Sequence, residues 1–113
     1  MVQIYFTDAG GELRVDMKGH GDLGNIEKLD VMCAACTTLA NTLSLNVLSA
    51  EETGYLEEPP TVYIGEDGEG RARILCKPRA EHYALVKAVF ITVVNGFLML
   101  SALYPEHVEL VRE

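Results

Sequence analysis

The apolar segment at residues 80–102 restricts the fold more than any other feature of this sequence. It carries hydrophobic side chains nearly all round, which is typical of a helix in a protein core. Thr92, Asn95 and Ser101 dilute the apolar run, so a core helix is expected and not a membrane span. A chain of 113 residues, 49% of them hydrophobic, can bury a core without a metal or disulfide. We therefore expect one domain over residues 1–113, with no membrane partner. The exposed side of this helix predicts contact with a second subunit, hence a homodimer.

Alternating side chains predict five strands around turns rich in glycine. The first hairpin is expected at residues 2–6 and 12–18, and the second at residues 62–64 and 71–77. A last strand is expected at residues 108–111. Hairpins make neighbouring strands antiparallel, so the sheet should be mostly antiparallel.

A second helix is predicted at residues 31–50, because apolar residues recur there at helical spacing and Asp30 is a good N-cap. The expected order is therefore ββαββαβ. Two helices on one face of a mostly antiparallel sheet make an α+β two-layer sandwich.

The net charge of the chain limits the classes of partner that can be expected. With 9 Lys and Arg against 17 Asp and Glu, the formal net charge is −8. This charge argues against direct nucleic-acid binding, which needs a cationic surface, and it favours a basic partner. Three cysteines do not form a secreted disulfide framework, and the N-terminus lacks the pattern of a signal peptide. A reducing cytoplasm is the expected location.

Cys33 and His20 are the candidate catalytic pair. Cys33 falls in the first turn of the predicted helix, where free N–H groups and the helix dipole stabilise a thiolate and offer donors to an oxyanion. His20 precedes it on a glycine-rich stretch, Gly19–Asn25, that predicts a loop containing Gly21 and Gly24. If the loop folds back, Cys33 is a nucleophile and His20 its general base.

The same segment allows other interpretations. Cys33-Ala34-Ala35-Cys36 has the spacing of a thiol–disulfide oxidoreductase, although Cys36 lies on the apolar stripe of the helix. Thr37 lies one turn after Cys33 on the same helix face, where its hydroxyl can contact a substrate or bond back to the helix. Asp30 either caps the helix or orients the histidine. No metal site or cofactor is expected, because a second Cys-x-x-Cys or a close histidine pair is absent. His82 and His107 are expected to be solvated.

Two motifs resemble the ribosomal-processing cysteine protease family (Prp, YsxB-like). They are Met17-Lys18-Gly19-His20 at the exit of a strand and Asp30-Val31-Met32-Cys33-Ala34-Ala35 at the start of a helix. The resemblance extends over essentially the whole chain. It implies a homodimeric cysteine endopeptidase that removes the N-terminal extension of large-subunit ribosomal protein number twenty-seven during ribosome assembly, with a mobile loop over the active site.

The resemblance also assigns residues. Cys33 matches the nucleophile and His20 the base, while Gly19 and Asp30 match the neighbours of these two. Thr37 replaces a serine that is usual in the family, and Gly21 stands where many members have alanine. Two alternatives stay open at this point. One is a binding module of ribosome assembly without catalytic activity, and the other is an oxidoreductase that uses Cys33 and Cys36.

Overall fold

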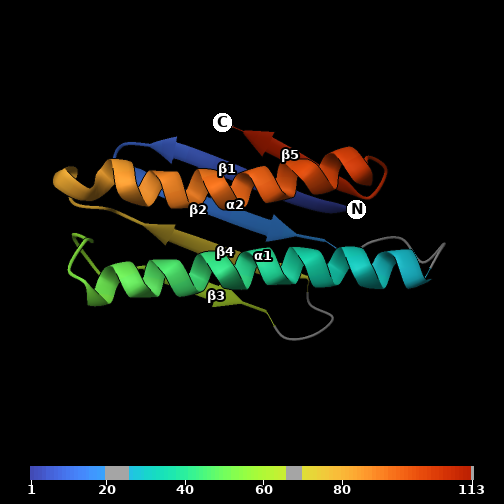
Figure 1. Ribbon diagram of the computed structural model, residues 1–113, viewed down its shortest axis with the longest axis horizontal. Coiled ribbons are helices and arrows are strands. Elements are labelled where there is room, and N and C mark those ends of the chain that lie inside the picture. The colour runs from blue at the N-terminus through green and yellow to red at the C-terminus, as the bar shows by residue number, and fades with distance from the viewer. Residues whose placement is uncertain (20–25, 66–69, 113) are drawn as a thin grey trace.

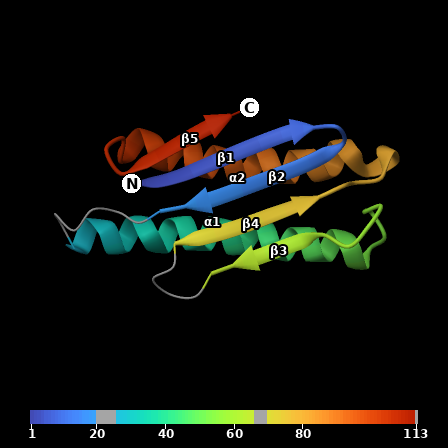
Figure 2. The ribbon, with the colours of Figure 1, turned by 180° about the vertical axis from the view of Figure 1, so that it is seen from behind.

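The fold is a two-layer α+β sandwich, with one sheet covered on one face by two helices. The computed structural model describes residues 1–19, 26–65 and 70–112, and for residues 26–30 it describes the backbone only. Figure 1 shows both helices in front of the sheet, and Figure 2 shows the sheet from its other side. The elements, in chain order, are β1 (Val2–Ala9), β2 (Glu12–Lys18), α1 (Ile26–Glu52), β3 (Thr61–Ile64), β4 (Arg71–Cys76), η1 (Ala80–His82), α2 (Tyr83–Leu103) and β5 (Val108–Arg112). The predicted order ββαββαβ and the α+β class are confirmed.

The sheet is mixed, with strand order β3-β4-β2-β1-β5. The pairs β1–β2, β2–β4 and β3–β4 are antiparallel, as the alternating hairpins predicted. The pair β1–β5 is parallel, with Val2 opposite Val108. The first strand of the chain is thus an interior strand, with β2 on one side and β5 on the other.

The core lies between the helices and the sheet. It takes the residues of β1, β2 and β4 that alternate towards the helices, and one stripe from each helix. The largest fully buried side chains are Phe90, Phe97, Ile4, Leu13, Met32, Leu43 and Ile74. Helix α1 lies towards β3 and β4, and α2 lies towards β1 and β5 (Figures 1 and 2). The two helices also contact each other, and Gly96 on α2 leaves room there for the side chain of Leu39 on α1.

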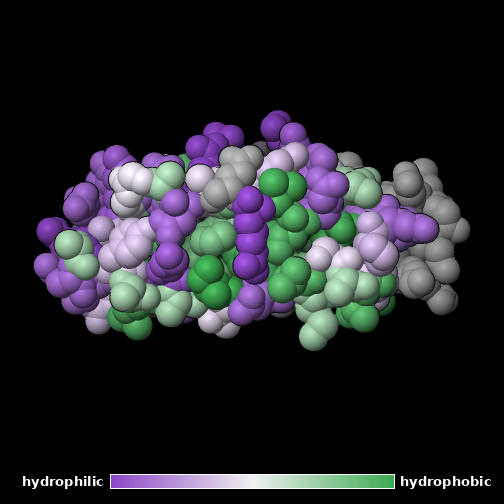
Figure 3. Space-filling model, turned by 90° about the horizontal axis from the view of Figure 1, so that it is seen from above, coloured by the Kyte–Doolittle hydropathy of each residue, from purple (hydrophilic) through white to green (hydrophobic). Residues whose placement is uncertain are grey.

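Both helices are long and apolar. By length and composition alone, Val31–Glu52 and Ala80–Leu103 are able to cross a membrane, a test that core helices of soluble proteins also meet. In this fold each helix packs on the sheet with one face and exposes large hydrophobic side chains on the other. On α2 the exposed ones are Leu85, Leu98, Met99 and Leu103. Figure 3, which looks down on the side of α2 and β5, shows hydrophobic areas separated by polar side chains.

Polar contacts fix the start of α2 against the sheet. Tyr83 donates a hydrogen bond to Asp8, and the ammonium of Lys87 lies 2.7 Å from the same carboxylate. The hydrogen bonds from Lys87 and Tyr83 lower the pKa of Asp8. Nearby, His82 is half-buried and stacks on Tyr55, with ring centroids 4.0 Å apart, so the prediction that His82 is solvated was wrong. The Nδ1 atom of His107 is also buried.

Because Asp16 on β2 is paired with two arginines, we expect the protein to lose stability in acid. Partial burial raises the pKa of Asp16, but hydrogen bonds from Arg73 and Arg14 outweigh burial and lower it below 3.8. The unfolded chain therefore takes up this proton first, and the stabilisation is complete above pH 3.8 and lost as the pH falls through the lower, folded value. In urea unfolding at pH 7 and pH 3, the wild type should lose more stability than Asp16→Asn. Equal losses would contradict this assignment.

Candidate active site

Gly19 fixes the direction in which the chain leaves β2. Its φ is +106°, a conformation that other residues rarely adopt, and a Cβ atom at this position would lie 2.1 Å from the carbonyl oxygen of Met1. The backbone of residue 19 therefore passes directly against the backbone before β1. Only glycine fits there without a shift of the main chain. This gives a structural reason for the predicted importance of Gly19, because the chain continues from it to His20.

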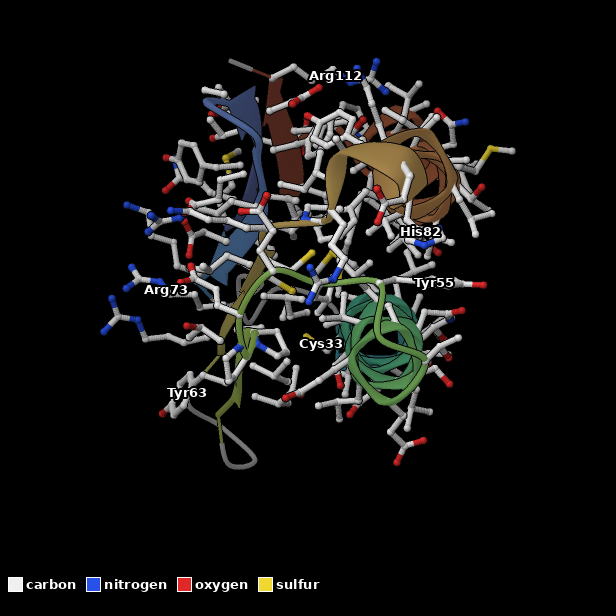
Figure 4. The ribbon with its side chains drawn as sticks, turned by 90° about the vertical axis from the view of Figure 1, so that its left-hand side faces the viewer. Cys33, Tyr55, Tyr63, Arg73, His82 and Arg112 are labelled. Atoms are coloured by element: carbon white, nitrogen blue, oxygen red, sulfur yellow. The ribbon has the colours of Figure 1, made fainter. Side chains whose placement is uncertain are left out.

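Cys33 lies on an exposed part of α1. Its neighbours in the buried stripe, Met32 and Cys36, are 0% and 2% exposed and fix the rotation of the helix against the core. Cys33 is outside this stripe, and its side chain is exposed. Figure 4 labels Cys33 on α1 in a view along the length of the molecule, seen from the end where α1 finishes. Its sulfur is thus accessible to a reagent or a peptide.

The other two cysteines are core residues. Cys36 and Cys76 are 2% and 1% exposed. Burial, together with the charge of Cys33, raises the pKa of Cys36 to about 11. Burial, together with Glu12, raises the pKa of Cys76 to about 11 as well. Both therefore remain thiols at neutral pH. A resolving cysteine needs access and thiolate character, so the burial of Cys36 argues against the oxidoreductase interpretation.

The prediction of where α1 begins was wrong. The helix begins at Ile26, not at residue 31, so Asp30 lies within the helix and is not its N-cap. Glu27, Lys28 and Leu29 are good helix formers, and residues 26–52 contain neither Gly nor Pro, which explains the earlier start. Cys33 is seven residues beyond Ile26, about 10 Å along the axis. Since the dipole effect is confined to the first turn, the free N–H groups of this helix do not reach Cys33.

Thr37 is exposed one turn beyond Cys33, on the face that the spacing predicted. Its carbonyl accepts a hydrogen bond of 2.9 Å from the side-chain amide of Asn41. The next residue, Thr38, bonds back to the carbonyl of Ala34 at 2.8 Å. The exposed side of α1 near Cys33 therefore carries small and polar side chains, together with the exposed side chain of Val31.

Other predicted site residues fall outside the described part of the chain. His20, Gly21 and Gly24 lie within residues 20–25, and the side chain of Asp30 is among those not described. The pairing of Cys33 with His20 therefore stays a prediction. Within residues 1–19, 26–65 and 70–112, no group of three His, Cys, Asp or Glu side chains is placed to hold a metal ion.

Comparison with known proteins shows similarity in structure. No protein-family model and no curated protein sequence matches the chain. A crystal structure of SMU.848 from Streptococcus mutans matches with a TM-score of 0.65 at 25% identity, covering 99% of this chain and 93% of that one. The ribosomal processing protease Prp from S. aureus, in complex with a substrate peptide, matches with a TM-score of 0.64 at 19% identity, over 100% of both chains.

Two more solved structures have a similar fold. Prp from S. aureus with a covalently linked product peptide matches with a TM-score of 0.61 at 19% identity, and a hypothetical protein from S. aureus matches with a TM-score of 0.54 at 15% identity. Each covers 100% of both chains. The resemblance to the ribosomal-processing proteases is thus confirmed in the fold, which this chain shares with Prp from end to end.

Proposed function

We propose that this protein is a cysteine endopeptidase with Cys33 as nucleophile and His20 as general base. The observation that carries the proposal is the sorting of the three cysteines: Cys33 is exposed, while Cys36 and Cys76 are buried in the core. Cys33 also lies in the segment whose motif resembles the nucleophile of the ribosomal-processing proteases. The fold adds support, because S. aureus Prp, which has this fold, has been crystallised with a substrate peptide and with a covalently linked product.

The reaction would follow the usual course of a cysteine protease. His20 takes the thiol proton of Cys33, and the sulfur attacks the scissile carbonyl carbon. The tetrahedral intermediate collapses as His20 donates that proton to the leaving amine, which leaves a thioester on Cys33. Water, deprotonated by His20, then hydrolyses the thioester and frees the thiol.

The position of Cys33 along α1 implies that activation of its thiol depends more on His20 than we expected from the sequence. A cysteine at a helix N-terminus is activated partly by the helix itself, but the free N–H groups of α1 are about 10 Å away. We infer that activation depends on His20, and that the oxyanion donors come from elsewhere than the first turn of α1. Alkylation of Cys33 by iodoacetamide at pH 7 should therefore slow by about tenfold or more in His20→Ala. An unchanged alkylation rate would contradict this role for His20.

A basic protein is the proposed substrate. The net charge of −8 attracts a cationic chain, and long-range attraction raises the rate of encounter. The resemblance narrows this class to a large-subunit ribosomal protein, number twenty-seven, that carries an N-terminal extension. Free cysteines are compatible with a reducing compartment, so we propose that cleavage occurs in the cytoplasm.

Mass spectrometry can test the reaction directly. The purified protein is mixed with the extended ribosomal protein, and the products are weighed over time. The expected result is two fragments, with a transient adduct on the enzyme that has the mass of the acylating fragment. Binding without any fragment at any enzyme concentration would support the non-catalytic binding module instead.

We also propose a homodimer, supported by the exposed hydrophobic face of α2. The side chains of Leu98, Met99 and Leu103 are 48%, 62% and 62% exposed. Single exposed hydrophobic residues are common on protein surfaces, but several on one helix are typical of an interaction surface. A Met99→Lys, Leu103→Lys double variant should weaken the dimer by about tenfold or more, because each change removes apolar burial. Sedimentation equilibrium measures the association. A wild type that stays monomeric at all concentrations would contradict the proposal.

A further inference from the structure

The open face of the sheet gathers several cations, although the chain as a whole is acidic. Both helices cover one face, and none of the described elements covers the other (Figures 1 and 2). On this open face, β2 and β4 carry Arg14, Lys18, Arg71 and Arg73, four of the nine Lys and Arg residues of the chain. Figure 4 shows Arg73 and Tyr63 on the side of the sheet away from the helices.

The strand register orders these side chains into rows. Tyr5 on β1 is opposite Asp16 on β2, Asp16 is opposite Arg73 on β4, and Arg73 is opposite Tyr63 on β3. In the next row, Lys18 is opposite Arg71. Directly opposed residues lie on the same face of a sheet. Two tyrosine rings therefore lie on either side of the cationic strands.

Asp16 orients two of the cations without covering them. It lies 2.6 Å from Nε of Arg14 and 2.9 Å from Nε of Arg73. Both contacts are made by Nε of the arginine. The side chain of Arg73 stays 53% exposed. Among the residues that the structure describes on β1, β2, β4 and β5, the other acids on this face are Glu12, the first residue of β2, and Glu109 on the edge strand β5.

A hollow lies over these rows. Its volume is about 670 Å³, and its lining includes Tyr5, Lys18, Tyr63, Arg71 and Arg73. The ammonium of Lys18 lies 5.2 Å from the centre of the Tyr5 ring, so cation and ring already share one surface. The hollow thus combines cations with aromatic rings: Lys18, Arg71, Arg73 and Tyr63 are exposed, and Tyr5 is half-buried.

We propose that the open face of β3, β4, β2 and β1 binds single-stranded RNA. Cations on adjacent strands match the phosphates of an extended backbone, and the rings of Tyr5 and Tyr63 offer surfaces on which unpaired bases stack. An acidic peptide would use the cations but not the rings. The net charge of −8 argued against nucleic acid, but binding depends on local charge, and this face is locally cationic.

Fluorescence anisotropy with a labelled 20-nucleotide single-stranded RNA of mixed sequence tests the proposal. With three or four phosphate contacts, the affinity of the full-length protein should fall about 20- to 50-fold between 50 and 200 mM salt. Arg71→Gln should weaken binding by about fivefold and reduce the salt slope by about 0.7. The matched control is Arg112→Gln, which removes the same charge at an exposed residue whose register places it opposite Phe6, on the face of the helices.

A second variant separates RNA from an acidic protein. Tyr5→Leu retains an apolar side chain but removes the ring, and it should weaken RNA binding by about tenfold. Polyglutamate serves as the competing acidic polymer. The proposal is overturned if wild-type protein does not bind the RNA, if Arg112→Gln weakens binding as much as Arg71→Gln, or if polyglutamate binds equally well and Tyr5→Leu binds RNA normally. Peptide cleavage should be unchanged in Arg71→Gln, so this result is separate from the protease proposal.

Discussion

Cys33→Ala should reduce kcat/KM for cleavage of the extended ribosomal protein by about 10⁴-fold or more, because loss of a nucleophile removes the covalent route entirely. Cys33 is exposed, so the change leaves the core intact, and the variant should unfold at the same urea concentration as the wild type. Cleavage is measured by separating the two fragments after single-turnover reactions. The residual activity should not depend on pH through the thiol.

Cys36→Ala is the matched control. It removes a sulfur three residues away in the same helix, but from a side chain that is 2% exposed. It should lower stability slightly through lost packing and leave kcat/KM within about twofold. If Cys36→Ala abolished activity as completely as Cys33→Ala, both thiols would be needed, as the oxidoreductase interpretation requires. If neither variant changed cleavage, the nucleophile would lie elsewhere.

Gly19→Ala should damage both stability and activity. The backbone at φ +106° strains any residue with a side chain, and the new Cβ would overlap the carbonyl oxygen of Met1. Because that neighbour is backbone, β1 or the exit of β2 has to shift. We expect a loss of about 2–3 kcal/mol in the free energy of unfolding. We also expect kcat/KM to fall by about 100-fold, since His20 follows this residue and a shift near 1 Å disturbs catalysis on that scale.

Gly10→Ala separates the strain of a positive φ from the steric overlap with Met1. Gly10 also has a positive φ, +63°, but a Cβ there meets nothing within 4 Å. It lies in the turn between β1 and β2, so its cost should be near 1 kcal/mol, without an effect on cleavage. Urea unfolding and kcat/KM are measured for both variants. Equal losses in the two would show that the contact with Met1 has no special role.

Local patterns predicted most of the fold. The alternation of Leu13, Val15 and Met17 gave β2 its bounds, and the apolar spacing on α1 identified Met32 and Cys36 as buried. These patterns work because burial has the period of the element that forms it. The start of α1 was missed because Asp30 is a good cap in isolation, but the helix formers before it extend the helix to Ile26.

Contacts between distant segments could not be predicted. The parallel pair β1–β5 joins the two ends of the fold, and no pattern within either strand specifies it. The contact of Gly19 with Met1 is of the same kind. Arg71 and Arg73 alternate with the buried residues of β4, but their position beside Asp16 depends on the β2–β4 register. The net charge of the whole chain does not reveal the cations that the sheet brings together on its open face.

The parallel pairing of β1 with β5 has a consequence for the order of folding. The support for Gly19 is the backbone of Met1, and the adjoining amide of Val2 donates a hydrogen bond of 2.7 Å to His107, just before β5. During synthesis, the β1–β2 hairpin can form early, but the edge of β1 stays open until β5 has been made. The chain exit at Gly19 is therefore held in place only after a long-range contact closes, a step that is slow compared with hairpin formation. A nascent chain with Cys33 already in a helix would still lack the finished scaffold of the candidate active site.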